Sequence, residues 1–211
     1  MRSANPRSWS WLTLAVLALG LVFTVLPESL RTACEYDRHA LANGEVWRLW
    51  TAHFVHFSAR HAGIDLLTLS VIGICVEHRS GWFLLAGLLI CAPPVLSLAL
   101  YFGVPDLLVY RGASAFCVAC GVVLGLVLWH GAPAMRRWLF GIAAAFACKL
   151  VYEATLGAMN LSGLNGGVRI AWQAHALGAA FGIFAFMAWR CRGPISIQEN
   201  RDAATAPRLL A

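Results

Sequence analysis

The chain has 211 residues, of which 60% are hydrophobic and 12% are charged, and its mean hydropathy is +0.69. A soluble globular protein carries about 25% charged residues, so this composition excludes that class and indicates an integral membrane protein. The net charge is +6, but the basic residues stand singly or in pairs, which excludes a nucleic-acid-binding surface. The expected surroundings are therefore a lipid bilayer, with no nucleic acid as partner.

Six apolar segments approach the roughly 20 residues that a membrane-spanning helix requires. They predict an all-α polytopic membrane protein with one six-helix domain over residues 1–190. A polar tail, predicted to be disordered, follows over residues 191–211. The six predicted spans are Trp9–Leu26, His61–Glu77, Trp82–Phe102, Ser114–Trp129, Trp138–Leu156 and Ala171–Trp189.

The first segment also has features of a cleaved signal, because Arg2 and Arg7 precede its apolar run. The Ala-Cys pair that ends at Cys34 resembles a lipoprotein site. Pro27 and Arg31 separate that cysteine from the apolar run, however, which favours a retained helix. Six helices place both termini on one side, and the modest bias of flanking arginines assigns that side to the cytoplasm.

The loop over residues 27–60 is predicted to lie on the outer face and partly in the membrane interface. Its stretch "NGEVWRLWTAHFVHFSARH" is amphipathic, so we expect Arg48 and Arg60 to face water. The expected interfacial side chains are Trp47, Leu49, Trp50, Phe54 and Phe57.

The seven cysteines predict neither a disulfide framework nor a metal site, because most of them lie within apolar segments. The pair "CVAC", Cys117 and Cys120, has the spacing of a metal or redox pair, but no second ligand pair accompanies it. Small core-filling side chains are the favoured interpretation, and no cofactor is expected.

Two polar residues of the apolar segments are predicted to meet. Ser114 opens the fourth segment and His175 lies near the start of the sixth, so the two side chains share a depth in the membrane. Gly178 and Gly182 follow His175 at helical spacing, and small residues also follow Ser114. Faces of small residues let membrane helices approach closely. The small residues after Ser114 are Cys117, Gly121 and Gly125.

Each residue alone has an ordinary structural explanation, Ser114 as a helix cap and His175 as a hydrogen-bonded core histidine. Together, a serine beside a neutral imidazole has the chemistry of a nucleophile and its general base. Gly112, two residues before the serine, is predicted to let backbone N–H groups approach a reacting carbonyl. The start of the following helix adds the positive end of its dipole.

These residues belong to a set of motifs that resembles the rhomboid family of intramembrane serine proteases. The matching pieces are Trp47–Arg48, "HFSARHAGID" entering the second segment, "GAS" opening the fourth, and "AHALGAAFG" in the sixth. The resemblance covers Gly44 to Trp189. It implies the six-helix rhomboid core with a water-filled cavity open to the outer face.

The resemblance also implies roles for individual residues. Ser114 would be the nucleophile and His175 its base, in a dyad with no third acid. His61 and the backbone N–H of Ser114 would line the oxyanion hole. The implied reaction is hydrolysis or acyl transfer at a peptide bond of a membrane-anchored protein, through an acyl-enzyme on Ser114.

One position departs from the family pattern, because Asp65 stands where the family has asparagine. An asparagine donates a hydrogen bond to the oxyanion, whereas an ionised aspartate repels it. Three alternatives stay open: a protonated Asp65 that donates, an ionised Asp65 that orients His61, or a side chain that points elsewhere. The departure also motivates the alternative function, a catalytically inactive rhomboid-like protein that binds clients.

Lys149 and Glu153 share a face of the fifth segment, where they either neutralise each other or contact substrate. "YRGAS" followed by "KLVYE" in a short six-helix chain resembles the rhombosortase subgroup. That resemblance implies substrates that are secreted bacterial proteins ending in a Gly-Gly motif, an apolar helix and a basic cluster. It also implies a bacterial inner-membrane location, with the active site opening to the periplasmic side.

Two other functional classes fit the sequence less well. A small transporter could use the polar residues of the fifth and sixth segments as an ion path. It predicts broken helices in matched halves, but Pro93–Pro94 is the single such break in the sequence. A metalloprotease would need an HExxH motif, and the cluster of His53, His56 and His61 does not provide one.

Overall fold

The computed structural model describes residues 10–156 and 172–191, so the predicted tail, apart from Cys191, lies outside the described residues. Within those residues, five helices are long and apolar enough to cross a membrane, and α1 (Trp11–Val25) is a shorter apolar helix. This architecture confirms the predicted all-α polytopic membrane protein. The five long helices are α5 (Ala59–Ser80), α6 (Trp82–Gly103), α7 (Ser114–Gly131), α8 (Arg136–Leu156, preceded by the 3₁₀ turn η1, Pro133–Met135) and α9 (Trp172–Cys191).

The first predicted span is shorter in the structure than the sequence suggested. Helix α1 has 15 residues, about 22 Å at 1.5 Å per residue, against a hydrocarbon core of about 30 Å. Its C-cap, Leu26, has ψ 147°, an extended value, because the ring of Pro27 disfavours helical backbone in the preceding residue. Helix α1 therefore ends at Val25, two residues before this proline.

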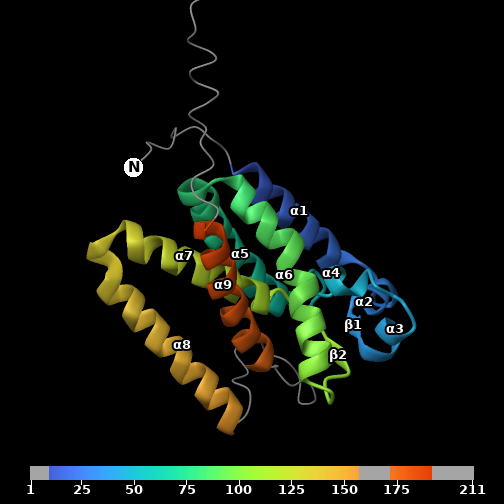
Figure 1. Ribbon diagram of the computed structural model, residues 1–211. Helices are drawn as coiled ribbons and strands as arrows, with labels where there is room; N and C mark the ends of the chain where they lie inside the picture. Colours follow the sequence, from blue (N-terminus) through green and yellow to red (C-terminus); the bar gives the residue numbers. More distant parts are fainter. Residues whose placement is uncertain (1–9, 157–171, 192–211) are drawn as a thin grey trace, which may run out of the picture.

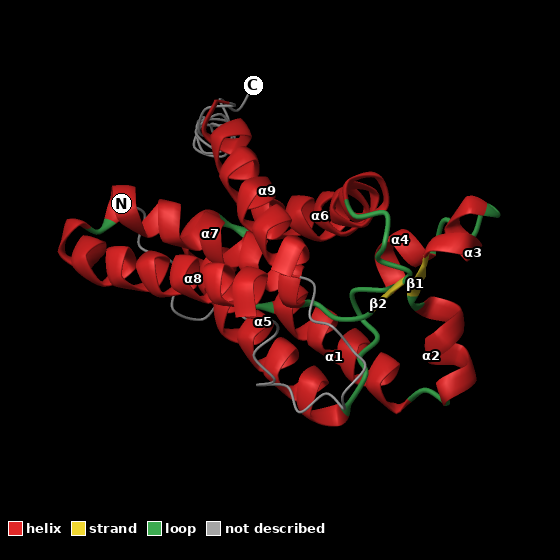
Figure 2. Ribbon diagram, turned by 90° about the horizontal axis from the view of Figure 1, so that it is seen from below, coloured by secondary structure: helices red, strands yellow, loops and turns green. Residues whose placement is uncertain are grey.

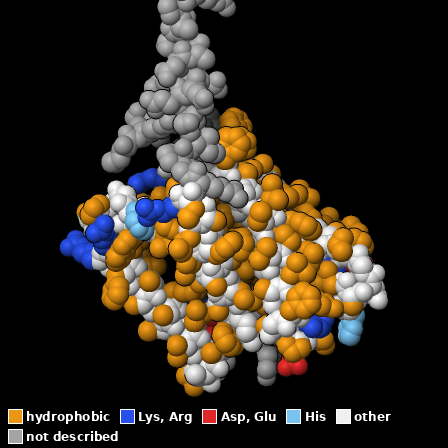
Figure 3. Space-filling view, viewed as in Figure 1, with side chains coloured by type: hydrophobic (Ala, Val, Ile, Leu, Met, Phe, Trp, Pro, Cys, Tyr) orange, Lys and Arg blue, Asp and Glu red, His pale blue; other side chains and the backbone are white. Residues whose placement is uncertain are grey.

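Helix α7 lies inside the bundle, and α8 lies at its edge. The most extensive helix contact joins α7 to α9, and α5 packs against another face of α7. Figure 1 shows α8 standing away from the other helices, and Figure 2 shows the same bundle seen from below. Within the described helix α8, Glu153 is the single buried residue. Hydrophobic side chains cover most of the face in Figure 3, as a lipid-facing surface requires.

Two adjacent prolines stay inside α6 without ending it, and the first loop compensates for them. Pro94 has no N–H, so the carbonyl of Ile90, four residues earlier, loses its intrahelical donor. The indole N–H of Trp50 donates to that carbonyl at 3.1 Å. His53 lies next to the same break, with Nε2 3.1 Å from the carbonyl of Pro93. Burial lowers the pKa of His53 to about 4, so this imidazole is neutral at pH 7.

The outer loop folds into short helices and a short strand, and the strand is hydrogen-bonded to the segment before Ser114. It contains α2 (Glu28–Cys34), β1 (Tyr36–Asp37), α3 (Arg38–Ala42) and α4 (Arg48–Thr51). Strand β1 pairs antiparallel with β2 (Val109–Tyr110), with Tyr36 opposite Tyr110. The loop is therefore linked by backbone hydrogen bonds to the turn that carries the serine.

The prediction that Arg48 faces water is wrong. This side chain is buried, and its Nη1 donates to the carbonyls of Thr32 and Glu35 at 2.7 and 2.8 Å. Its Nε donates to the carboxylate of Glu45 at 2.8 Å. The carbonyls at the end of α2 have no intrahelical donors, and a buried guanidinium with several N–H groups supplies them. Arg60 is exposed, as expected.

Candidate active site

Gly112 forms the sharp turn before Ser114. Its φ is +127°, a value that residues with side chains rarely adopt, and its N–H donates to the carbonyl of Ala52 at 3.0 Å. A Cβ atom at this position would lie 2.8 Å from Cε1 and 2.9 Å from Nε2 of His61. The glycine thus permits both the turn and the approach of His61. Its own N–H is already bonded to Ala52, so the backbone N–H groups that Gly112 could bring near a reacting carbonyl are those of the residues after it.

The N–H groups near the serine that lack an intrahelical acceptor belong to the start of α7. The first hydrogen bond within this helix joins the N–H of Cys117 to the carbonyl of Ala113 at 2.8 Å. The N–H groups of Ser114, Ala115 and Phe116 come before it and have no intrahelical acceptor. They lie at the positive end of the helix dipole, where a developing negative charge is stabilised. The start of α7 therefore presents N–H groups that its own backbone does not bond.

His175 lies in α9 directly beside Ser114. Its Nε2 is 3.1 Å from the Ser114 Oγ, and the imidazole is buried. The two helices come this close because α9 has Gly178 one turn after His175. A Cβ atom on Gly178 would lie 2.3 Å from the carbonyl oxygen of Ala115. The helices thus meet at van der Waals contact of backbone with backbone, and the structure brings serine and histidine together.

The face of α7 that meets α9 is not the predicted one. Ala115 and Ala119 contact the two glycines of α9, whereas the sequence suggested Cys117 and Gly121. Cys117 faces α5 instead, with its Sγ 3.5 Å from the carbonyl of Asp65. Because α5 occupies that side of α7, the contact with α9 lies further round the helix.

Gly178→Ala is expected to separate α7 from α9, because its Cβ has no room beside the Ala115 carbonyl. Overpacking of a close contact costs about 1–3 kcal/mol, so the melting temperature in detergent should fall. Gly125→Ala in α7 is the matched control, since a Cβ there meets no atom within 4 Å and alanine favours a helix by up to about 1 kcal/mol. Equal melting temperatures for the two variants would contradict the close contact.

A carboxylate lies on the far side of the His175 ring, so the expectation of a dyad with no third acid is not met by the geometry. The Oε2 of Glu153 is 3.2 Å from the Nδ1 of His175. The Oε1 of the same carboxylate accepts from Lys149 Nζ at 2.7 Å, and that nitrogen lies 3.2 Å from the same Nδ1. The predicted ion pair between Lys149 and Glu153 therefore exists and includes the imidazole as a third member.

Asp65 accepts hydrogen bonds at the base of the serine turn. Its Oδ2 accepts the N–H of Ala113 at 2.8 Å and lies 3.3 Å from the Nε2 of His61. Of the three alternatives for this residue, the geometry favours a carboxylate that orients His61 and holds the turn. An ionised carboxylate is an acceptor only, which suits an oxygen that faces both a backbone N–H and an imidazole nitrogen.

His56 belongs to the same buried cluster, and sequence reasoning did not place it there. Its Nε2 lies 3.2 Å from the Oδ2 of Asp65, and its ring packs edge-on against His61 with centroids 5.0 Å apart. The signal in the sequence is the position of His56 five residues before His61, at the entry to the second span. Among the described residues, no group of three or more His, Cys, Asp or Glu side chains is arranged to hold a metal ion.

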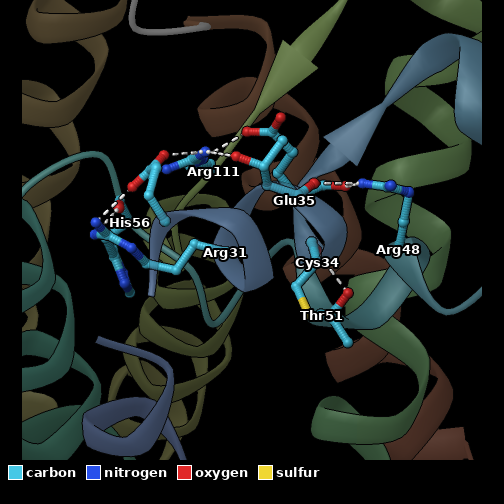
Figure 4. Close-up of polar contacts among 9 residues, drawn as sticks. Arg31, Cys34, Glu35, Arg48, Thr51, His56 and Arg111 are labelled. Carbon is cyan, nitrogen blue, oxygen red and sulfur yellow. Dashed lines mark hydrogen bonds and ion pairs between the residues drawn. The ribbon is translucent and has the colours of Figure 1, made fainter. Parts of the chain in front are cut away.

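Arg111 joins the serine turn to the outer loop through two ion pairs. Its Nε lies 2.5 Å from the carboxylate of Glu35, and its Nη2 lies 2.8 Å from that of Glu28. Figure 4 shows Glu35 between Arg111 and Arg48, contacted by both. Arg111 is buried, not at the surface. Burial opposes its charge, but the hydrogen bonds to Glu28 and Glu35 outweigh that effect and raise its pKa above its ordinary value.

The sequence matches the Rhomboid domain over residues 43–191, more than two thirds of the chain. The chain belongs to the rhomboid family. No match is found among the curated proteins. Rhomboids are intramembrane serine proteases that act on membrane proteins within the bilayer.

The matched range of this rhomboid includes every residue of the site described above except the two glutamates that contact Arg111. Helix α1 and the first part of the outer loop, residues 27–42, precede the match, and Glu28 and Glu35 lie in that part of the loop. The match thus covers the helices that carry Ser114 and His175. Glu28 and Glu35, which together form a clamp on Arg111, lie in the part of the chain outside the match.

Proposed function

We propose that this rhomboid is an active intramembrane serine protease with Ser114 as nucleophile and His175 as general base. The observation that carries the proposal is the 3.1 Å separation of Ser114 Oγ and His175 Nε2 at the start of α7. Nε2 takes the hydroxyl proton while Oγ bonds to the substrate carbonyl carbon. The imidazolium then gives that proton to the departing amine as the C–N bond breaks, and a water molecule hydrolyses the acyl-enzyme.

The oxyanion of this reaction would form beside the first N–H groups of α7. The N–H of Ser114 is the proposed backbone donor. His61 is the proposed side-chain donor: its Nε2 faces Asp65, so Nδ1 can donate to the oxyanion only when the ring carries both N–H protons. Removal of one such donor commonly lowers the rate by about 10²–10³. In this arrangement Asp65 replaces the family asparagine as a support for His61, which favours the active protease over the inactive client-binding alternative.

The proposed substrates are secreted bacterial proteins with a C-terminal Gly-Gly motif, an apolar helix and a basic cluster, as in the rhombosortase subgroup. The motifs around Ser114 and Glu153 support this assignment. Gly-Gly weakens a helix by about 1 kcal/mol per residue, so the backbone there unwinds readily and exposes a peptide bond. The proposed location is the bacterial inner membrane, with both termini cytoplasmic and the site open to the periplasm.

A reporter protein carrying such a C-terminal segment tests this function in proteoliposomes. We expect the wild-type protein to release the reporter near the two glycines and Ser114→Ala to release none. Mass spectrometry of the new C-terminus shows whether it is free or joined to a lipid-derived group. A reporter whose glycines are replaced by alanine should resist cleavage; equal cleavage of both reporters would refute the Gly-Gly specificity while leaving the protease activity in place.

A further inference from the structure

The most unusual residue of α8 is its one buried side chain, which is a carboxylate. The other residues of this helix are exposed or half-buried, and the helix stands at the edge of the bundle (Figure 1). The side chain of Glu153 is 1% exposed, although an ionised carboxylate is costly to bury. Hydrophobic packing of α8 does not explain why the Glu153 side chain is buried. A polar partner within the bundle is therefore needed to explain its position.

The partners of Glu153 are a cation on one oxygen and the imidazole on the other. Lys149 Nζ lies 2.7 Å from Oε1, and His175 Nδ1 lies 3.2 Å from Oε2. The ammonium of Lys149 offsets the charge of the carboxylate inside the membrane. The oxygen that faces His175 still needs a donor, because an unsatisfied buried acceptor costs about 1–3 kcal/mol.

Two hydrogen-bonding patterns are compatible with these distances, and they give opposite tautomers of His175. If Lys149 donates to Nδ1, the ring proton lies on Nε2, which then cannot accept the proton of Ser114. If Nδ1–H donates to Glu153, the lone pair of Nε2 faces the Ser114 hydroxyl. The second pattern satisfies both oxygens of Glu153, and the first leaves Oε2 without its donor.

We propose that Glu153 is a positioning residue that accepts Nδ1–H of His175 and so holds the imidazole in the tautomer that acts as a base. Lys149, with Nζ 2.7 Å from Oε1, serves as the counter-ion of this carboxylate. The proposal rests on the function proposed for Ser114 and His175. It assigns this rhomboid an arrangement of serine, histidine and acid in place of a simple dyad.

Glu153→Gln is the first test, measured by the rate of Ser114 labelling with a fluorophosphonate. Lys149 is expected to hold the amide oxygen of the glutamine, which turns the amide NH₂ toward Nδ1 and selects the wrong tautomer. In a serine protease such a change lowers kcat about 10⁴-fold. We expect the maximal labelling rate to fall about 10²-fold or more, with the concentration for half-maximal rate unchanged. Thr155→Val, on the exposed side of the same helix, should label like the wild type.

The tautomer itself is visible in the ¹⁵N NMR spectrum of the histidine ring, assigned by difference from His175→Asn. The wild-type signal should be that of a ring protonated on Nδ1, and the Glu153→Gln signal that of a ring protonated on Nε2. A role in stability alone would not move this signal. Wild-type labelling rate or an unchanged tautomer in Glu153→Gln would overturn the proposal.

A pair of uncharged double variants keeps the test valid if Glu153→Gln alone does not fold. Lys149→Met/Glu153→Gln has no cation to hold the amide oxygen, so that oxygen is free to accept Nδ1–H. Lys149→Met/Glu153→Leu has no acceptor at all. We expect the first to label at least tenfold faster than the second, and equal rates would overturn the proposal. Absence of labelling in the folded wild-type protein would instead refute the function proposed for Ser114.

Discussion

Replacement of either Ser114 or His175 by alanine is expected to abolish labelling of the folded protein by a fluorophosphonate serine probe. The probe reacts with a serine only when a neighbouring base removes its proton. In this site the His175 Nε2, the proposed base, lies 3.1 Å from the Ser114 Oγ, and the close contact of α7 and α9 holds both groups. In a well-studied serine protease, loss of either residue alone lowers kcat by about 10⁶, so labelling should fall below detection in both variants.

Ser70→Ala serves as the control for this experiment. Its hydroxyl donates to the carbonyl of Leu66 in its own helix at 2.6 Å, away from the turn that carries Ser114. Labelling should therefore persist in this variant. A folded wild-type protein that does not label would favour the inactive client-binding alternative. Asp65→Asn would then be the first reversion to examine, since it restores the family residue.

The helices and the central contact of the site could be predicted from the sequence because both depend on local patterns. The long apolar runs locate the spans, and Gly81, with φ +87°, separates α5 from α6. Ser114 and His175 both stand near the start of a predicted span, so their common depth follows from topology. The predicted spans agree with the helices of the structure because their positions depend on hydrophobicity alone.

The polar contacts could not be predicted, because their partners are far apart in the sequence. Arg111 and Glu35 are separated by 76 positions, and each alone has the character of an exposed loop residue. Glu153 already has a partner at i−4 in Lys149, so no unpaired charge indicated a further contact. His175, the third member, lies 22 positions away on another helix. Charge pairing across a bundle depends on helix rotation, which composition does not fix.

The clamp on Arg111 leads to the second large expected effect, on stability. Glu35 is buried and its carboxylate pairs with Arg111, whereas Glu28 pairs with the same guanidinium from a side chain that is 60% exposed. Removal of one partner from a buried pair leaves an uncompensated charge, at a cost of about 3–5 kcal/mol. An exposed pair contributes about 0–1 kcal/mol. The two glutamates should therefore differ sharply in importance.

Arg111→Ala is expected to lower the free energy of unfolding in detergent by about 3–5 kcal/mol, because it leaves the buried Glu35 carboxylate of the outer loop without its cation. Glu28→Gln, which removes the exposed partner, should cost less than about 1 kcal/mol. The double variant Arg111→Met/Glu35→Met removes both buried charges, and we expect it to recover most of the stability lost in Arg111→Ala. Equal losses in Arg111→Ala and Glu28→Gln would show that the buried pair does not hold the loop. If the double variant is stable but labels slowly at Ser114, the clamp also positions the serine turn, since Arg111 directly precedes Gly112.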